Sequence, residues 1–141
     1  MTVTLSDRER QYIALFEDEV GVTIRDCVVD EERDRVLFVV KAGDMSEAIG
    51  PGGRNVEQIE DRLDAAVELT EDADTAAAFV ANALAPAAVY NVTISENDDR
   101  IAYAEVDHDD TGVAIGKDGR NIEAARHLAE RHFDIDDIQL T

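Results

Sequence analysis

Two short glycine-containing segments carry the residue types and spacing that suggest binding chemistry. They read Ile49-Gly50-Pro51-Gly52-Gly53-Arg54 and Ile115-Gly116-Lys117-Asp118-Gly119-Arg120. Glycine has no Cβ, so a polymer backbone can approach such a turn closely and the turn can adopt positive φ. A helix that follows the turn would offer N–H groups and the positive end of its dipole, which together favour an anion. Arg54 and Arg120 stand where a guanidinium can reach a phosphate. We therefore predict two anion-binding turns.

The two segments belong to an internal repeat with a spacing of 66 residues. Asp44–Glu57 reads DMSEAIGPGGRNVE and Asp110–Glu123 reads DTGVAIGKDGRNIE, and eight of these 14 positions are identical. A single Gly-x-x-Gly segment is as compatible with a tight helix–turn–helix corner as with a binding loop. Two copies, each preceded by Ile and followed by Arg-Asn and an aliphatic residue, favour the binding interpretation.

The local charge at both turns is positive in a strongly acidic chain. The sequence has 33 Asp and Glu against 13 Lys and Arg, a formal net charge of −20. Ile49–Val56 and Val113–Ile122 each carry +1, so the other 123 residues carry −22. Positive charge at the same place in both copies is the strongest functional signal in the composition.

The acidity itself indicates the solvent in which the protein works. There are two lysines, Lys41 and Lys117, against eleven arginines, and the two halves of the chain carry −11 and −9. A solvated, acidic, lysine-poor surface suits very high salt, where self-repulsion is screened. We interpret the chain as a halophile's protein; the alternative is an acidic surface that binds a basic partner, and the even spread of charge disfavours it.

Hydrophobic periodicity predicts the same six elements in each copy: helix, strand, strand, helix, helix, strand. In the first copy the expected elements are a helix from Ser6 to Gly21, strands Val22–Val29 and Arg35–Lys41, helices Asp44–Ile49 and Asn55–Asp64, and strand Ala66–Thr70. In the second they are a helix from Asp74 to about Ala85, strands Val89–Ser95 and Arg100–Asp107, helices Asp110–Ile115 and Asn121–His132, and strand Asp137–Leu140. We predict an α+β fold of two domains, 1–72 and 73–141, each a three-stranded sheet covered by helices.

Individual residues support these boundaries. Ser6 and Glu9 form a capping-box pattern. Asp44, Asp74 and Asp110 are expected N-caps. The lone Cys27 lies in an apolar run and is interpreted as a core residue. Three tyrosines are interpreted as core or sheet residues: Tyr12, Tyr90 and Tyr103.

Several classes of function lack support in the residues. A single cysteine gives no disulfide framework and no thiolate zinc site. Asp107-His108-Asp109-Asp110 is better explained as an acidic loop before a helix than as a metal site. No nucleophile motif, nucleotide-binding fingerprint, 18-residue apolar stretch or signal-peptide pattern occurs. We expect a cytoplasmic, non-enzymatic protein without metal, cofactor or membrane association.

The repeated segment resembles the I-G-x-x-G-x-x-I/V motif of KH domains of type II (prokaryotic) topology. The motif occurs twice, at Ile49–Val56 and at Ile115–Ile122. With the repeated elements around it, the resemblance covers nearly the whole chain. A pair of acidic KH units is most similar to the archaeal NusA-like transcription termination/antitermination family. That resemblance implies binding of single-stranded RNA on nascent transcripts, with RNA polymerase or its transcription complex as a further partner, and we expect a monomer.

The resemblance also implies a role for each residue of the two loops. The sugar-phosphate chain would contact Gly50, Pro51, Gly52 and Gly53, and Gly116, Lys117, Asp118 and Gly119. The apolar floor of the two grooves would be Ile49, Val56 and Ile59, and Ile115 and Ile122. Phosphate contacts would come from Arg54, Lys117 and Arg120.

Two departures from the family pattern keep other functions open. The variable pair of the first loop, Pro51-Gly52, has no basic residue, and Asp118 in the second loop should repel phosphate. A KH protein of ribosome assembly or RNA processing is one alternative, because the loops do not separate it from a transcription factor. A protein-interaction adaptor whose loops no longer bind RNA is the other.

Overall fold

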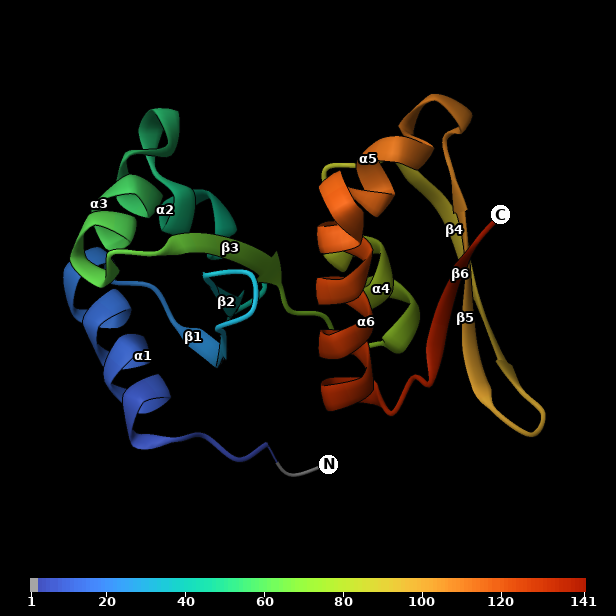
Figure 1. The fold of residues 1–141 in the computed structure, drawn as a ribbon, viewed down its shortest axis with the longest axis horizontal. Helices are drawn as coiled ribbons and strands as arrows, with labels where there is room; N and C mark the ends of the chain where they lie inside the picture. The colour runs from blue at the N-terminus through green and yellow to red at the C-terminus, as the bar shows by residue number, and fades with distance from the viewer. Residues whose placement is uncertain (1–2) are drawn as a thin grey trace. The chain divides into compact units, whose positions relative to one another are not determined.

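The computed structural model describes residues 3–141, and residues 4–141 divide into two compact units, Thr4–Asp72 and Ala73–Thr141. We call them the N-terminal and C-terminal units. The N-terminal unit consists of α1 (Asp7–Val20), β1 (Ile24–Asp30), β2 (Arg35–Val40), α2 (Met45–Ile49), the 3₁₀ turn η1 (Pro51–Gly53), α3 (Arg54–Leu63) and β3 (Ala66–Glu71). The C-terminal unit consists of α4 (Ala76–Ala83), β4 (Val89–Glu96), β5 (Arg100–Val106), η2 (His108–Asp110), α5 (Thr111–Ile115), η3 (Lys117–Gly119), α6 (Arg120–Phe133) and β6 (Asp137–Leu140). The predicted order of six elements per copy is confirmed (Figure 1).

Each unit contains one three-stranded sheet with the same connections. β1 pairs antiparallel with β2, which pairs parallel with β3, and β4, β5 and β6 repeat this arrangement. The first strand of each sheet carries a register shift near its start, between Ile24 and Asp26 and between Val89 and Asn91. The parallel pairs need a crossover connection, which the two helices around the glycine turn supply. The topology therefore places the turn between helices that pack on the sheet.

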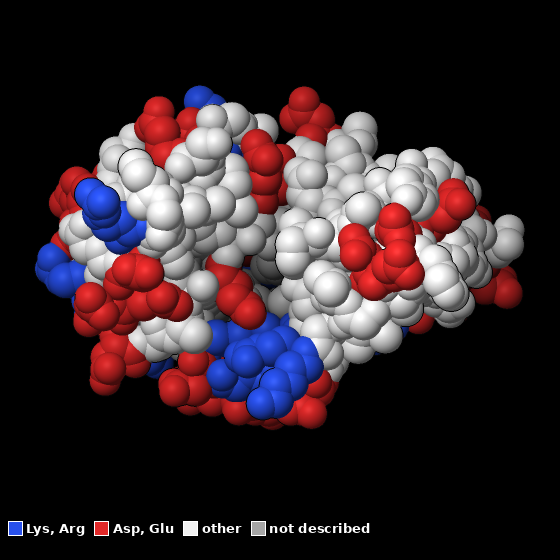
Figure 2. Space-filling model, turned by 90° about the horizontal axis from the view of Figure 1, so that it is seen from above, with Lys and Arg blue, Asp and Glu red and all other residues white. Residues whose placement is uncertain are grey.

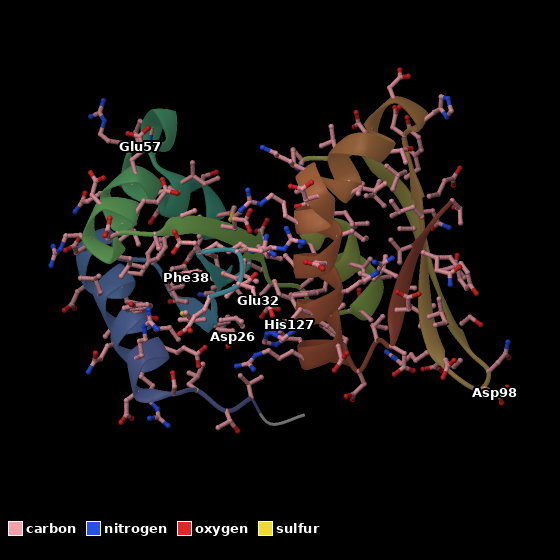
Figure 3. All side chains as sticks on the ribbon, viewed as in Figure 1. Asp26, Glu32, Phe38, Glu57, Asp98 and His127 are labelled. Carbon is pink, nitrogen blue, oxygen red and sulfur yellow. The ribbon has the colours of Figure 1, made fainter. Side chains whose placement is uncertain are left out.

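Helix α1 begins and ends at the residues that the sequence indicates. The Ser6 hydroxyl accepts from the Glu9 amide and the Glu9 carboxylate accepts from the Ser6 amide, which completes the capping box. Gly21 ends the helix in the left-handed conformation at φ 81°. The helix buries Phe16, which packs edge-to-face on Phe38 of β2 with ring centroids 5.0 Å apart. Phe38 lies inside the unit (Figure 3), and Cys27 joins this core as predicted.

The C-terminal unit has its own core between α4, α6 and the sheet. Four fully buried side chains form its centre: Phe79, Leu84, Leu128 and Ile138. Phe79 also contacts the Phe133 ring, with centroids 5.2 Å apart. Helix α6 has 14 residues against ten in α3, so the prediction that it is about one turn longer is confirmed.

Two details of the sequence interpretation are corrected, and a third is confirmed. Thr75, not Asp74, caps α4, because its extended backbone lets the Thr75 hydroxyl accept from the Ala78 amide at 3.2 Å. Asp44 and Asp110 occupy N-cap positions but make no capping hydrogen bond to their own helices. Tyr90 and Tyr103 lie in strands, which confirms the prediction that they are core or sheet residues, and both are exposed.

The surface reflects the composition. Asp and Glu side chains occur across the face shown in Figure 2, while Lys and Arg occur at fewer places on it. Among residues 3–141, no helix is long and apolar enough to cross a bilayer.

Candidate nucleic-acid interface

The two glycine turns have the same backbone conformation although their variable residues differ. Gly50 and Gly116 have φ/ψ of 76°/170° and 79°/169°. At the third position Gly52 has 63°/21° and Asp118 has 56°/26°. In both turns the last glycine donates its amide to the carbonyl of the first at 3.1 Å. The left-handed third position is one that Asp tolerates better than most side chains, so the conformation is shared despite the Gly-to-Asp difference.

The first glycine of each turn is required by the asparagine that follows the turn. A Cβ built on Gly50 would lie 2.6 Å from the Asn55 side chain, and one on Gly116 would lie 2.8 Å from Asn121 Cβ and N. Asn55 Nδ2 donates to the Glu47 carbonyl at 2.7 Å. Asn121 Nδ2 donates to the carbonyls of Ala114 at 3.0 Å and Leu84 at 3.3 Å. Each asparagine therefore joins the helix after the turn to the helix before it.

A second contact fixes the helix that precedes each turn. Asp44 Oδ2 accepts from the Thr23 amide at 2.9 Å, and Asp110 Oδ2 accepts from the Ala88 amide at 2.8 Å. These carboxylates bind the backbone just before β1 and β4 instead of capping their own helices. Both copies therefore share a hydrogen bond that fixes the position of the helix before the turn relative to the sheet; it is half-buried in the first copy and exposed in the second.

The predicted site residues fall into an exposed and a buried group. The tips of the turns are exposed, as are the isoleucines before them, with Ile49 at 38% and Ile115 at 40%. Val56 is half-buried, whereas Ile59 is fully buried and Ile122 is 5% exposed. Ile59 and Ile122 lie beneath the surface, and Ile49 and Ile115 contribute exposed apolar area beside the turns.

The basic side chains at the turns differ in their surroundings. Within the described part of the chain, Arg54 and Lys117 are exposed and make no ion pair or side-chain hydrogen bond. Several arginines elsewhere are paired with carboxylates, as Arg35 is with Asp30 and Glu68. Arg120 is half-buried. Unpaired cations in so acidic a protein leave charge available for a phosphate.

The turn amides contribute less than the sequence suggests. The Gly53 amide donates to the Gly50 carbonyl and the Arg54 amide donates to the Pro51 carbonyl. The second turn uses the equivalent amides of Gly119 and Arg120 in the same way. The 3₁₀ turn therefore uses two amides at the start of each following helix, and fewer N–H groups remain for an anion.

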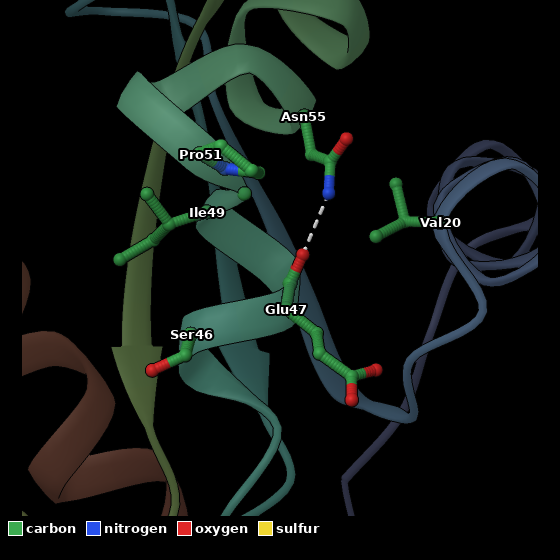
Figure 4. Close-up of a pocket in the computed structure, with 7 residues that line it drawn as sticks. Val20, Ser46, Glu47, Ile49, Pro51 and Asn55 are labelled. Atoms are coloured by element: carbon green, nitrogen blue, oxygen red, sulfur yellow. Dashed lines mark hydrogen bonds between the residues drawn. The ribbon is translucent and has the colours of Figure 1, made fainter.

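A hollow of about 600 Å³ lies beside the first turn. It is lined by Val20, Ser46, Glu47, Ile49, Gly50, Pro51 and Asn55. Figure 4 shows Ile49 and Ser46 on one side of α2 and Glu47 on the other, with Asn55 facing Val20. The hollow is open to solvent. In the described residues, no group of three or more His, Cys, Asp or Glu is placed to hold a metal ion.

The asparagines are the site residues to which the sequence alone assigns no role. Asn55 and Asn121 are identical in the repeat alignment, and this identity is the signal that could have identified them. Their position one residue after Arg places them in the first turn of the following helix. Their contact with the preceding helix depends on the fold of the turn, which repeat matching does not show.

These observations define the class of protein: two α-β-β-α-α-β units, each with a glycine loop between two helices, are tandem KH domains. Residues 10–76 match the family described as KH domain, and residues 76–141 match the NusA-like second KH domain. The solved structure described as "Crystal structure of APE1850" superposes with a TM-score of 0.86 at 30% sequence identity, covering 97% of this chain and 100% of that chain.

Curated relatives specify the family further. The chain is 65% identical over 140 residues to the probable transcription termination protein NusA of Halococcus morrhuae, covering 99% of both chains. It is 62% identical over 141 residues to that of Halobacterium salinarum, covering all of both. It is 33% identical to that of Methanocaldococcus jannaschii, covering 98% of this chain and 75% of that protein. The chain belongs to the archaeal NusA family, and the halophilic sources of its similar relatives agree with its acidic composition.

Proposed function

We propose that the protein binds single-stranded RNA through the two loops as a transcription termination or antitermination factor. The observation that carries the proposal is the repeated loop: one backbone conformation in both units, with an exposed isoleucine before it and an unpaired cation in it or directly after it. KH loops hold the backbone of about four nucleotides while the bases lie beside the loop. We assign this role to the two domains 1–72 and 73–141.

The residues of the two loops indicate what each loop contributes to the affinity for RNA. The first loop offers an exposed, uncharged backbone turn at Pro51 and Gly52, and its cation is Arg54, directly after the turn. The second loop adds the Lys117 ammonium, while Asp118 limits how closely a phosphate can approach. Ile49 and Ile115 offer apolar contact to bases. With so few phosphate contacts, binding should depend weakly on salt, which suits a concentrated salt solution.

The transcriptional role rests on the relatives, whose names state transcription termination. We propose RNA polymerase or its transcription complex as the assembly on which the protein acts, and the cytoplasm as its location. The proposed action is non-enzymatic, since binding and positioning of the transcript need no reaction at the loops. Copurification with RNA polymerase rather than with ribosomal subunits would separate this role from ribosome assembly.

The central test is RNA binding in molar KCl by the wild type and by Gly52→Asp and Lys117→Asp. Gly52→Asp should fold normally, because Asp118 already occupies the equivalent backbone conformation in the other loop. Both variants should lose affinity for single-stranded RNA, since each places a carboxylate where the phosphates pass. Arg10→Gln, on the distant start of α1, is the matched charge control and should bind as the wild type does.

Two results would overturn the proposal. One is a wild type that binds no RNA from a random single-stranded pool in molar KCl. The other is full affinity in both loop variants while their melting temperatures match that of the wild type. Either result would favour the adaptor alternative, in which the loops have a partner other than RNA.

A further inference from the structure

The hollow beside the first loop is lined by acceptor groups that have no donor among the residues that the structure describes. Glu47 is exposed, lines the hollow, and has no hydrogen bond or ion pair from its carboxylate among residues 3–141. Asn55 uses its Nδ2 for the Glu47 carbonyl, which leaves Oδ1 as an acceptor. Val20 faces Asn55 across the hollow (Figure 4) and supplies an apolar wall. The part of the hollow that Val20, Glu47 and Asn55 line therefore has an apolar wall with hydrogen-bond acceptors beside it.

The second loop lacks this chemistry. At the spacing of the repeat, Ser46 and Glu47 correspond to Gly112 and Val113. In addition, Asn121 Nδ2 donates to the Leu84 carbonyl at the end of α4, which joins that helix directly to α6. In the N-terminal unit the corresponding asparagine makes no bond to α1, and the hollow lies at that place. The two loops share a backbone but differ in what their surroundings can recognise.

We propose that Glu47 is a base-selecting residue: the hollow of the N-terminal unit accepts a nucleobase that carries an amino group and rejects uracil. This inference rests on the proposed function and specifies the RNA for one of its two sites. Carboxylates accept from the amino group of cytosine in direct readout. Adenine offers an equivalent amino group, whereas the N–H of uracil is flanked by two carbonyl oxygens that a carboxylate repels.

The dimensions and charge of the site agree with such an occupant. The hollow is an open surface depression of about 600 Å³, and a flat nucleobase can lie against such a surface. The groups at its edge are acceptors, apart from the Ser46 hydroxyl, so a donor edge is complementary to them. Pro51 has no amide to donate, which further reduces the donors available to a uracil carbonyl.

The experiment compares binding of C, A and U homopolymers of equal length to the full chain. The wild type should bind C and A about tenfold more tightly than U, the discrimination expected of one good carboxylate–base contact. Glu47→Val installs the residue of the other repeat and should reduce the C-to-U ratio to about one, with the change mostly in tighter binding of U. Glu47→Gln should also bind U better, because its amide can donate to a carbonyl.

Two control variants separate base selection from general charge. Glu57→Gln removes a carboxylate from α3, close to the same loop (Figure 3) but outside the lining of the hollow, and should leave the C-to-U ratio unchanged. Val113→Glu adds a carboxylate beside the second loop and should weaken C, A and U alike. Both positions are exposed, so melting temperatures should stay near that of the wild type.

The outcomes are distinct. If the wild type binds all three polymers and Glu47→Val leaves the ratio of C to U affinity unaltered, the role of Glu47 is overturned. The proposed RNA binding then still stands. A ratio that Glu57→Gln or Val113→Glu changes as much as Glu47→Val also overturns it, since any nearby charge would then suffice. Wild type that binds none of the polymers, nor pooled RNA, overturns the proposed function as well.

Discussion

The side-chain amide of Asn55 donates a hydrogen bond to the carbonyl oxygen of Glu47 at 2.7 Å. This bond connects the first turn of α3 with α2 across the glycine loop, and the same side chain fills the space where a Cβ at Gly50 would lie. Loop conformation is therefore held by a side chain outside the loop.

Removing the asparagine side chains should destabilise the two units unequally. Asn55→Ala loses one hydrogen bond and should reduce the free energy of unfolding by about 1 kcal/mol. Asn121→Ala loses bonds to two carbonyls and should cost about 2 kcal/mol. Urea denaturation of the full chain measures both. Asn97→Ala, at the exposed turn between β4 and β5, is the control and should change stability by less than about 0.5 kcal/mol.

Replacing the first glycine of either loop by alanine should lower the free energy of unfolding. A second substitution, of the asparagine after the loop, should relieve this loss in the first loop only. Gly50→Ala and Gly116→Ala each place a side chain at positive φ against a neighbour closer than 3.0 Å, which should cost about 2–3 kcal/mol. Asn55→Ala removes the atoms nearest to the Gly50 Cβ, so the double variant should be less destabilised than the sum. At Gly116 the obstacles are the Cβ and amide nitrogen of Asn121, which alanine retains.

A double-mutant cycle measured by urea denaturation tests this difference. A coupling of about 1 kcal/mol is expected for the Gly50–Asn55 pair and a smaller one for Gly116–Asn121. Gly112→Ala, in α5 with no atom within 4 Å of its built Cβ, should be neutral or stabilising. Equal coupling in both pairs would contradict the packing described.

The salt dependence of RNA binding should be shallow. With Arg54, Lys117 and Arg120 as the phosphate contacts, log K against log salt for a single strand should have a slope of about −2. Arg54→Gln and Lys117→Gln should each reduce its magnitude by about 0.7. Fluorescence anisotropy over a series of KCl concentrations measures the slopes. A wild-type slope several times steeper would indicate a broad basic surface, which a charge of −20 does not provide.

The pKa of Asp107 should respond to Tyr90. The Tyr90 hydroxyl donates to Asp107 Oδ2 at 2.5 Å, and this hydrogen bond, with a further one from the Asp109 amide, lowers the pKa of the Asp107 carboxyl. The same contact raises the pKa of Tyr90. A lowered carboxyl pKa stabilises the fold above the unfolded value of about 3.9, and this stabilisation is lost as the pH falls through the folded value.

Tyr90→Phe should move the Asp107 pKa back toward its ordinary value, which an NMR titration of the carboxyl carbon detects. Stability at neutral pH should fall slightly, and the difference from the wild type should vanish at a pH below both pKa values. Tyr103→Phe is the control, as Tyr103 is also exposed on the sheet and makes no side-chain hydrogen bond among residues 3–141. An unchanged Asp107 titration in Tyr90→Phe would refute the contact.

Much of the fold follows from local patterns. The capping box at Ser6, the glycine at position 21 and the apolar spacing around Phe16 together fix α1, because capping and helical periodicity act within a few residues. The same holds for the loops, whose Ile-Gly-x-x-Gly spacing locates both turns between helices. Asp74 was the wrong cap because two candidate residues stand side by side, and the backbone at Thr75 decides between them.

The sequence by itself determined the repeat, the α+β class, the positions of the two loops and the local positive charge within a chain of −20. Only the tertiary structure showed that Ile59 and Ile122 are buried while Ile49 and Ile115 are exposed, and that Asn55 and Asn121 hold the loops. It also placed Glu47 and Val20 around one hollow, although they are 27 residues apart in the sequence. The physical reason is range: periodicity and capping act between near neighbours, whereas burial and side-chain contacts depend on which surfaces the folded chain brings together.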